Sequence, residues 1–341
     1  MVTASAMRRT TMSARPESLR GAKAALITSE RPSTAAITVR DREAGIQGLT
    51  LEDLPHPHAD ENDVIVRVHA AGFTRGELDW PATWTDRAGR DRTPSVPGHE
   101  VSGVVTELGY GTTGLTVGQR VFGLADWTRN GSLAEFVAVE ARNLAPLPAD
   151  VDHTAAAALP ISELTAWQGL FDHARLTTGQ TVLVHGAAGG VGSVAVQLAH
   201  EAGARVVGTG RSADRDTVLD LGAHAFLDLE ADRWEGTGQV DVVFDVIGGD
   251  ILDRSAALVR PGGTLVSIVQ QPPRAPRRRA GRVLRRGTRP RTPRRPRPAS
   301  EGRPDAGVRR CGAVRSLADA PAAFTSGQRV PGRTIIRVAE D

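Results

Sequence analysis

A glycine-rich turn carries the strongest chemical signal in the sequence. The apolar run 181–184 enters this turn, and a helix-forming stretch at residues 193–199 follows it. Such a strand–turn–helix unit directs backbone amides at the start of the helix toward a pyrophosphate group. A tight turn that needs glycine only for packing is the alternative, but four glycines in seven residues exceed what one turn requires. We expect this turn to bind a dinucleotide through Gly186, Gly189, Gly190, Val191 and Gly192.

The end of the next strand indicates which dinucleotide would bind. A site for NAD places an acidic residue there, about 20 residues after the turn, on the ribose hydroxyls. This chain has Gly210 and Arg211 at that position, with Arg215 one helical turn further on. Guanidinium groups without a carboxylate favour the 2′-phosphate of NADP(H). The alternative is that Arg211 and Arg215 are ordinary solvated surface charges.

Two different sequence patterns, one on each side of about residue 150, predict the domains that position these residues. Up to about residue 150, short β-branched runs such as 64–68 and 101–105 alternate with glycine turns, which is typical of a compact β domain. Short strands are also expected within residues 21–41. From about residue 155, longer strands and helices alternate, which predicts a parallel sheet with crossover helices. The expected fold class is therefore α/β, with a β domain over 21–150 and a doubly wound parallel sheet over 151–271.

The composition excludes several classes of protein. A chain of 341 residues with 40% hydrophobic residues is long enough for two buried cores. Cys311 is the single cysteine, which excludes an internal disulfide and a zinc site of three or four thiolates and fits a reducing cytoplasm. No apolar run reaches the length of a membrane span. Residues 1–20 carry arginines without a following apolar block, so we expect a disordered extension and no signal peptide.

One segment carries much of the positive charge. Residues 272–310 hold 15 arginines and 8 prolines but only two acids, whereas the whole chain has a net charge of +3. The rest of the chain is therefore acidic, and we expect no nucleic-acid partner from its overall charge. Proline lacks the amide that a strand ladder needs and like charges repel, so the segment is predicted to form neither a strand nor a helix.

Seven short motifs follow one another along the chain: Ala70–Gly72, Pro97–Gly103, Gly118–Gly123, Leu164–Trp167, the glycine turn, Asp245–Gly249 and Pro261–Gly263. In this order they resemble the medium-chain dehydrogenase/reductases, specifically the zinc-independent, NADPH-dependent quinone oxidoreductase and enoyl reductase branch. The resemblance implies a GroES-like β catalytic domain over 21–150, completed by residues 312–341. It also implies a Rossmann NADP-binding domain over 151–271, an active site in the cleft between the domains, and a homodimer.

The resemblance implies hydride transfer from NADPH to a quinone or an α,β-unsaturated carbonyl compound. Zinc dehydrogenases of the family carry a cysteine where Phe73 and Thr74 stand here, and His99 alone cannot form a tetrahedral site, so we expect no metal. His99 is expected to be a hydrogen-bonded structural residue. Without a Lewis acid, an electron-poor double bond is the easier acceptor, because hydrogen bonds or water can stabilise the developing oxygen anion.

The resemblance also assigns the residues around the reacting groups. Thr165, Ile247 and Gly248 would line the nicotinamide slot, and Thr74 would border the substrate or be an ordinary loop residue. Trp80 and Trp84 follow Thr74 in the sequence, where they would stack on a flat quinone or enone, or equally cover the edge of the β domain.

The proton donor stays unassigned at this point. Tyr110 is the single tyrosine, and its glycine-rich surroundings favour a surface position. His56, His58 and His69 lack metal-site spacing and are expected on the surface or in loops. A nonenzymatic NADPH-binding protein is therefore the alternative function.

Residues 272–311 do not resemble the family, whereas both flanks do. Residues 313–324 predict an alanine-rich helix, and residues 332–338 predict a last strand. Lys23 is the single lysine against 41 arginines, which is typical of GC-rich coding DNA. Arginine and proline codons arise when such DNA is read out of frame, so we hypothesise that two compensating indels enclose the segment. A genuine disordered insert that binds RNA or a membrane surface is the alternative, and the segment would then inactivate the chain or weaken its cofactor binding.

Overall fold

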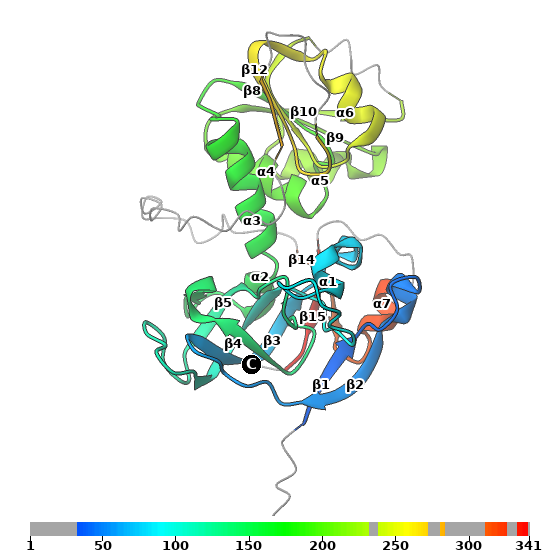
Figure 1. Cartoon of the computed structure of the whole chain (residues 1–341). Coiled ribbons are helices and arrows are strands. Elements are labelled where there is room, and N and C mark those ends of the chain that lie inside the picture. Colours follow the sequence, from blue (N-terminus) through cyan, green and yellow to red (C-terminus); the bar gives the residue numbers. More distant parts are fainter. Residues whose placement is uncertain (1–32, 232–237, 272–279, 284–310, 326–332, 340–341) are drawn as a thin grey trace, which may run out of the picture. The chain divides into compact units, whose positions relative to one another are not determined.

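The computed structural model describes residues 33–231, 238–271, 280–283, 311–325 and 333–339. The described strands include a six-stranded sheet in the order β10-β9-β8-β11-β12-β13 (Figure 1), in which every pair is parallel. Counted from β8, this is the order 3-2-1-4-5-6 of doubly wound dinucleotide-binding sheets. The predicted α/β fold is therefore confirmed. The strands are β8 (Thr181–Val184), β9 (Arg205–Gly210), β10 (Ala225–Asp228), β11 (Val240–Asp245), β12 (Val259–Ser267) and β13 (Ala280–Val283).

Helices cover both faces of this sheet, which explains why β8 is apolar throughout. Val182 and Val184 pack in one hydrophobic cluster with the helix after the glycine turn, whereas Leu183 points the other way and packs in a cluster with Leu252. The helices are α3 (Pro160–Trp167), the π-helical turn η4 (Gln168–His173), α4 (Gly190–Glu201), the 3₁₀ turn η5 (Ser212–Asp214), α5 (Arg215–Asp220) and α6 (Gly249–Ser255).

The second large sheet contains strands from both ends of the described chain. Its central strand β3 (Asp63–Gly72) pairs along one edge with β4, and along the other with β6 through its first half and with β15 through its second half. The C-terminal β15 therefore completes a sheet that N-terminal residues begin. The other strands are β4 (Glu100–Leu108), β5 (Arg120–Leu124), β6 (Phe136–Glu140), β7 (Leu144–Pro146), β14 (Cys311–Ser316) and β15 (Arg333–Arg337).

A separate antiparallel hairpin precedes this sheet, formed by β1 (Ser33–Thr38) and β2 (Thr50–Pro55). Ala36 and Ile37 of β1 are fully buried in the same core as Val64 and Val66 of β3. The extension over 1–20 and the strand expected around residues 25–28 lie outside the described residues. The short helices are η1 (Gly45–Gly48), η2 (Arg75–Asp79), α1 (Pro81–Trp84), η3 (Ala141–Asn143), α2 (His153–Ala157) and α7 (Ala320–Thr325).

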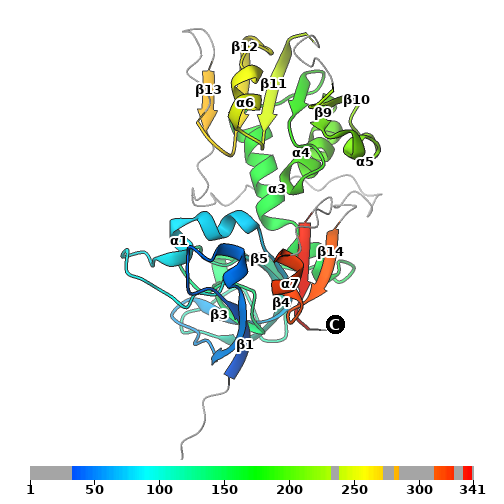
Figure 2. The ribbon, with the colours of Figure 1, turned by 90° about the vertical axis from the view of Figure 1, so that its right-hand side faces the viewer.

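Two predictions for the C-terminal part are wrong. Ala280–Val283, inside the arginine- and proline-rich segment, forms the edge strand β13 beside β12 (Figure 2). These four residues contain no proline, and an edge strand needs ladder hydrogen bonds on one side only. Residues 311–316 form β14, which pairs with β15, so the helix predicted over 313–324 is wrong in its first part and is confirmed only from Ala320, as α7. In the part of the chain that the structure describes, no helix is long and apolar enough to span a bilayer.

Candidate functional site

The glycine turn between β8 and α4 is folded tightly against its own backbone. Gly186 adopts a φ of +65°, a conformation that glycine enters without steric cost. A Cβ at Gly186 would lie 2.7 Å from Cγ2 of Val246, and a Cβ at Gly192 would collide with the carbonyl oxygen of Gly186. The amide of Gly189 donates a 2.9 Å hydrogen bond to that same oxygen. Two of the glycines are thus required by the turn itself.

Gly189 is different, and it tests whether the turn fits a dinucleotide. A Cβ built on Gly189 would meet only the carbonyl oxygen of Gly186, at 3.2 Å, and otherwise open space. A Cβ at 3.2 Å from a backbone oxygen is tight, so packing favours glycine there in part, and a phosphate that approaches the backbone closely would favour it further. Gly189 also caps α4, whose first amides have no partner inside the helix and carry the positive end of its dipole. The turn fits a pyrophosphate.

His185 anchors the strand that enters this turn. Its side chain is fully buried, with Nδ1 3.0 Å from Oγ1 of Thr209 and Nε2 2.8 Å from Oγ of Ser255. Burial lowers the pKa of His185 to about 4, and the nearby carboxylate of Asp245 opposes this only in part. The ring is therefore neutral near pH 7, and its two hydrogen bonds tie β8 to β9 and α6.

Asp245 shapes the second turn of the site, at the end of β11. Its Oδ1 accepts hydrogen bonds of 3.1 Å from the amides of Ile247 and Gly248, and its Oδ2 accepts one of 2.7 Å from Oγ of Ser267. Gly248 stands at φ 79°, ψ −163°, a region that only glycine enters readily. The side chain of Ile247, 39% exposed, reaches to 3.3 Å from the Cβ position of Gly186. The structure therefore brings Ile247 and Gly248 to the glycine turn.

At the end of β9 the structure adds a carboxylate that sequence spacing did not reveal. Oδ2 of Asp214 accepts a 3.2 Å hydrogen bond from the amide of Arg211, and its side chain lies against Gly210. The side chain of Arg211 is exposed. The guanidinium carbon of Arg215 lies 5.1 Å from the ring centroid of Phe226. Both arginines are exposed at the end of β9, Arg215 lies over the ring of Phe226, and the carboxylate of Asp214 lies beside the backbone of Arg211.

Thr165 lies within α3 and is partly exposed. The helix continues into η4, where Gly169 packs directly on the ring of Phe244 in β11. The start of α3 is tied to β4, because the amide of Ile161 donates a 2.8 Å hydrogen bond to Oε1 of the buried Glu100. Thr165 therefore stands on a helix that is fixed at both ends.

A buried carboxylate organises the region around Thr74. Glu77 is fully buried, and its two oxygens accept hydrogen bonds of 2.9 Å from the amides of Thr74 and Gly98. Thr74 thereby caps η2 and is held beside the segment that leads into His99. Glu77 was not expected as a site residue, although its place three residues after Thr74 is that of a capping box.

An aromatic cluster surrounds His99. The ring centroids of Trp80 and Trp127 are 4.9 Å apart, and those of His99 and Trp127 are also 4.9 Å apart. Burial lowers the pKa of His99 to about 3, and the charge of Arg92 acts in the same direction. His99 was expected to be hydrogen-bonded. This prediction is wrong for its Nδ1 atom, which has no hydrogen-bond partner among the described residues. Its Nε2 atom lies 3.9 Å from Oε2 of Glu77.

The other aromatic and histidine candidates, Trp84, Tyr110 and His69, differ in their burial. Trp84 is 8% exposed in the hydrophobic core and donates a 2.8 Å hydrogen bond from Nε1 to the carbonyl of Leu78, which favours packing over stacking on a substrate. Tyr110 is 87% exposed. The surface position expected for His69 is wrong, because β3 is buried along this length and His69 stacks on His153 with 4.5 Å between ring centroids.

Comparisons with known proteins agree with this geometry. A family model described as "Alcohol dehydrogenase GroES-like domain" matches residues 60–149, and one described as "Zinc-binding dehydrogenase" matches residues 190–284. The chain is 33% identical over 224 residues to the quinone oxidoreductase of Rattus norvegicus, with 63% of this chain and 67% of the rat protein covered. The chain belongs to the medium-chain dehydrogenase/reductase superfamily. Within it, the chain falls in the quinone oxidoreductase branch.

Two further matches place this medium-chain dehydrogenase/reductase among its relatives. It is 44% identical over 178 residues to a spectinabilin polyketide synthase system protein of Streptomyces orinoci, which covers 50% of this chain but 8% of that protein. The solved quinone oxidoreductase of Thermus thermophilus, studied also as a complex with NADPH, superposes with a TM-score of 0.70 at 31% identity. That match covers 89% of this chain and all of the Thermus chain.

The zinc chemistry of some family members does not fit the residues of this chain. Thr74 supplies no thiolate beside His99, and the ring of His99 packs edge-on against the indole of Trp127, with 4.9 Å between the ring centroids. Within the described ranges, no three histidine, cysteine, aspartate or glutamate side chains are grouped to hold a metal ion. We therefore derive no step through a metal.

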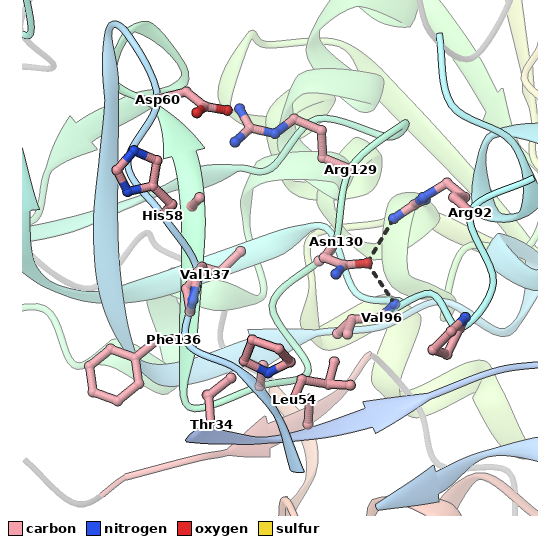
Figure 3. A pocket seen from close by; sticks show the side chains of 17 residues that line it. Thr34, Leu54, His58, Asp60, Arg92, Val96, Arg129, Asn130, Phe136 and Val137 are labelled. Carbon is pink, nitrogen blue, oxygen red and sulfur yellow. Dashed lines mark hydrogen bonds between the residues drawn. The ribbon is translucent and has the colours of Figure 1, made fainter. Parts of the chain in front are cut away.

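A separate cavity of about 580 Å³ lies in the β part of the chain (Figure 3). Arg92 forms part of its wall, and its guanidinium also donates to the carbonyl oxygens of Ala82 and Trp127, at 2.8 and 3.5 Å. Arg92 therefore links this cavity to the aromatic cluster. The sequence offered no signal for the cavity, because its walls come from five separate stretches of the chain.

Proposed function

We propose that the protein is an NADPH-dependent, zinc-independent oxidoreductase that transfers a hydride to a quinone or an α,β-unsaturated carbonyl compound. The glycine turn carries the proposal, because it lies at the carboxyl end of β8, next to β11, where the strand order of the sheet reverses. Dinucleotides bind at such switch points. The names of two relatives, a quinone oxidoreductase and an NADPH-dependent alkenal/one oxidoreductase, support the two acceptor classes.

The proposed cofactor site joins the three turns at the carboxyl ends of β8, β9 and β11. NADPH supplies the hydride when bound. Its pyrophosphate would lie on the α4 amides, and its 2′-phosphate on Arg211. Ile247 and Gly248, held by Asp245, would lie along the nicotinamide side with Thr165. The residues proposed to bind it are Thr165, Gly186, Gly189, Gly190, Val191, Gly192, Gly210, Arg211, Arg215, Ile247 and Gly248.

The proposed acceptor site is formed by Thr74 and by Trp80, with Trp127 as an addition from the structure. The partly exposed indoles of Trp80 and Trp127 offer flat apolar faces, which suit an uncharged conjugated acceptor. After hydride addition, the acceptor oxygen carries a negative charge that must be protonated. No side chain in this cluster is a general acid near pH 7, so we propose water as the proton source.

Thermal unfolding with NADPH, and with NADH as the control, tests the cofactor site first. A ligand that binds only the folded state stabilises it by about 2.7 kcal/mol at 100 times its Kd, which is a clear rise in Tm. The proposal predicts a larger rise with NADPH. Loss of NADPH absorbance with 1,4-naphthoquinone and with pent-3-en-2-one then tests the reaction. A rise in Tm without turnover on either acceptor would support the nonenzymatic alternative, and no rise would contradict the proposal.

A homodimer and a cytoplasmic location are further proposals that rest on the family resemblance. Sedimentation equilibrium tests the first, and a mass of one chain would contradict it. The frame-shift hypothesis for residues 272–310 is tested by sequencing the gene, because a template without the two indels would show a different protein segment there.

A further inference from the structure

The cavity in the β part of the protein is separate from the proposed cofactor turns. At about 580 Å³ it falls within the range of roughly 300–1,000 Å³ that small-molecule sites occupy. It opens between the hairpin β1–β2, the strand β6 and the loops around residues 92 and 130 (Figure 3). None of the glycines of the dinucleotide turn lines it.

Most of the wall is apolar. Leu54, Val96 and Phe136 face the space from three different elements, and prolines and alanines fill the remainder. Phe136 is half-buried and packs against His56 with 4.7 Å between ring centroids. An apolar group of the size of a phenyl ring would be removed from water here, which is the main source of affinity in such sites.

One end of the cavity carries a positive charge that lacks a direct counter-ion. The half-buried guanidinium of Arg92 donates to backbone carbonyl oxygens through Nη1 and to Oδ1 of Asn130 through Nη2, at 3.1 Å. All of these acceptors are neutral. Asp86 and Asp126 influence Arg92 through space only, and each is ion-paired with another arginine, Arg90 and Arg87 respectively.

Asn130 adds donors at the same end. Its Oδ1 accepts from Nη2 of Arg92 and from the amide of Val96, both at 3.1 Å, which leaves its Nδ2 group without a hydrogen bond among the described residues (Figure 3). Burial lowers the pKa of Arg92 to about 10, so the guanidinium stays charged near pH 7. A charged group and an amide donor therefore converge beside the apolar wall.

The side of the cavity lined by Arg129 and Asp60 does not attract an anion, because two carboxylates, Asp63 and Asp60, oppose the one guanidinium. Arg129 binds both oxygens of Asp63, at 3.0 and 2.6 Å, and its guanidinium also faces Asp60 (Figure 3). His58 is exposed on this side. The charges around the cavity therefore favour one orientation of a ligand. An anionic group fits at Arg92 and Asn130, and an uncharged body fits along the apolar wall.

We propose that this cavity binds a small amphipathic carboxylic acid, with its carboxylate on Arg92 and Asn130 and its apolar body against Leu54, Val96 and Phe136. The carboxylate would accept hydrogen bonds from Nδ2 of Asn130 and from the guanidinium, and it would supply the missing negative charge. The proposal does not depend on the reaction of the protein. Binding should also change the fluorescence of Trp127, because the guanidinium of Arg92 donates to the carbonyl oxygen of Trp127, at 3.5 Å.

Isothermal titration of the full chain with 4-phenylbutyrate tests the proposal, with 4-phenylbutanamide as the neutral match. We expect the acid to bind and the amide to bind at least about tenfold more weakly, since charge-assisted hydrogen bonds to Arg92 are lost. Binding should persist when NADPH is saturating, and it should change the tryptophan fluorescence. Equal binding of acid and amide, no binding of the acid, or competition with NADPH would each overturn the proposal.

Two variants locate the site. Arg92→Met should abolish the preference for the acid, and Phe136→Ala should weaken both ligands while leaving the preference intact. Arg90→Gln is the matched control: it removes an exposed arginine of the same loop, paired with Asp86, that does not line the cavity. If Arg92→Met unfolds, Asn130→Ala replaces it, and the NADPH-induced rise in Tm reports folding. Unchanged acid preference in a folded Arg92 or Asn130 variant would refute the assignment.

Discussion

The neutral, buried His185 should make the folded protein sensitive to acid in a defined pH range. The ring is hydrogen-bonded on both sides, to Thr209 and Ser255, and has no exposed surface. Burial lowers its pKa from 6.5 to about 4. In the unfolded chain this burial is absent, so the same ring regains its ordinary pKa.

The size and sign of the effect follow from proton linkage. Between pH 6.5 and about pH 4 the unfolded state binds one more proton at this residue than the folded state does. The free energy of unfolding therefore falls by ~1.4 kcal/mol for each pH unit on the acid side of 6.5. The contribution of neutral His185 is fully present above pH 6.5, and about 3 kcal/mol of it is lost when the pH reaches 4.

Urea unfolding of the wild-type chain and of His185→Gln across this pH range measures the effect. Glutamine keeps one donor and one acceptor for the two hydroxyl partners but does not titrate. We expect the wild type to lose about 3 kcal/mol more than the variant between the two pH values. His58→Gln, which changes an exposed side chain, is the control. Parallel pH dependence of wild type and His185→Gln, or protonation of His185 in the folded protein near pH 6.5 by NMR, would refute the reasoning.

Three further predictions concern the proposed site. Gly189→Ala should lower NADPH affinity at least about tenfold, measured by thermal shift, because its Cβ enters the space of the pyrophosphate, and it should lower the Tm of the free protein only slightly, because the Cβ meets one backbone oxygen at 3.2 Å. Arg211→Ser should weaken NADPH about tenfold and leave NADH unaffected in fluorescence titrations, since only the 2′-phosphate loses a charged partner. Trp80→Leu and Trp127→Leu should each raise the KM for 1,4-naphthoquinone about tenfold without changing NADPH affinity, because the flat acceptor no longer stacks on an indole ring. An unchanged KM would exclude these residues from the acceptor site.

Local chemistry explains which parts of this protein could be predicted from sequence. The glycine turn is a contiguous stretch, and its glycines themselves indicate the backbone conformation that it needs. The alternation of strands and helices after residue 155 predicts the doubly wound sheet. The motif Asp245–Gly249 is local in the same sense, since Asp245 binds amides two and three residues away. Patterns of this range are visible without a tertiary structure.

Features that depend on distant segments were missed or mistaken. Trp127 joins Trp80 and His99 only because the loop after β5 returns to them. His69 was expected on the surface or in a loop. It is buried because it lies in a strand that pairs on both edges.

The sequence by itself determined the fold class, the turn that suits a dinucleotide and the lack of thiolates for a structural zinc site, because each depends on residue type at short spacing. Only the tertiary structure decided that Ala280–Val283 forms a strand, that Trp84 is core while Trp80 stands in an aromatic cluster, and that Arg92 borders a cavity. The physical reason is common to all three. Pairing partners, burial and counter-ions come from residues far away in the chain, and they outweigh local propensity.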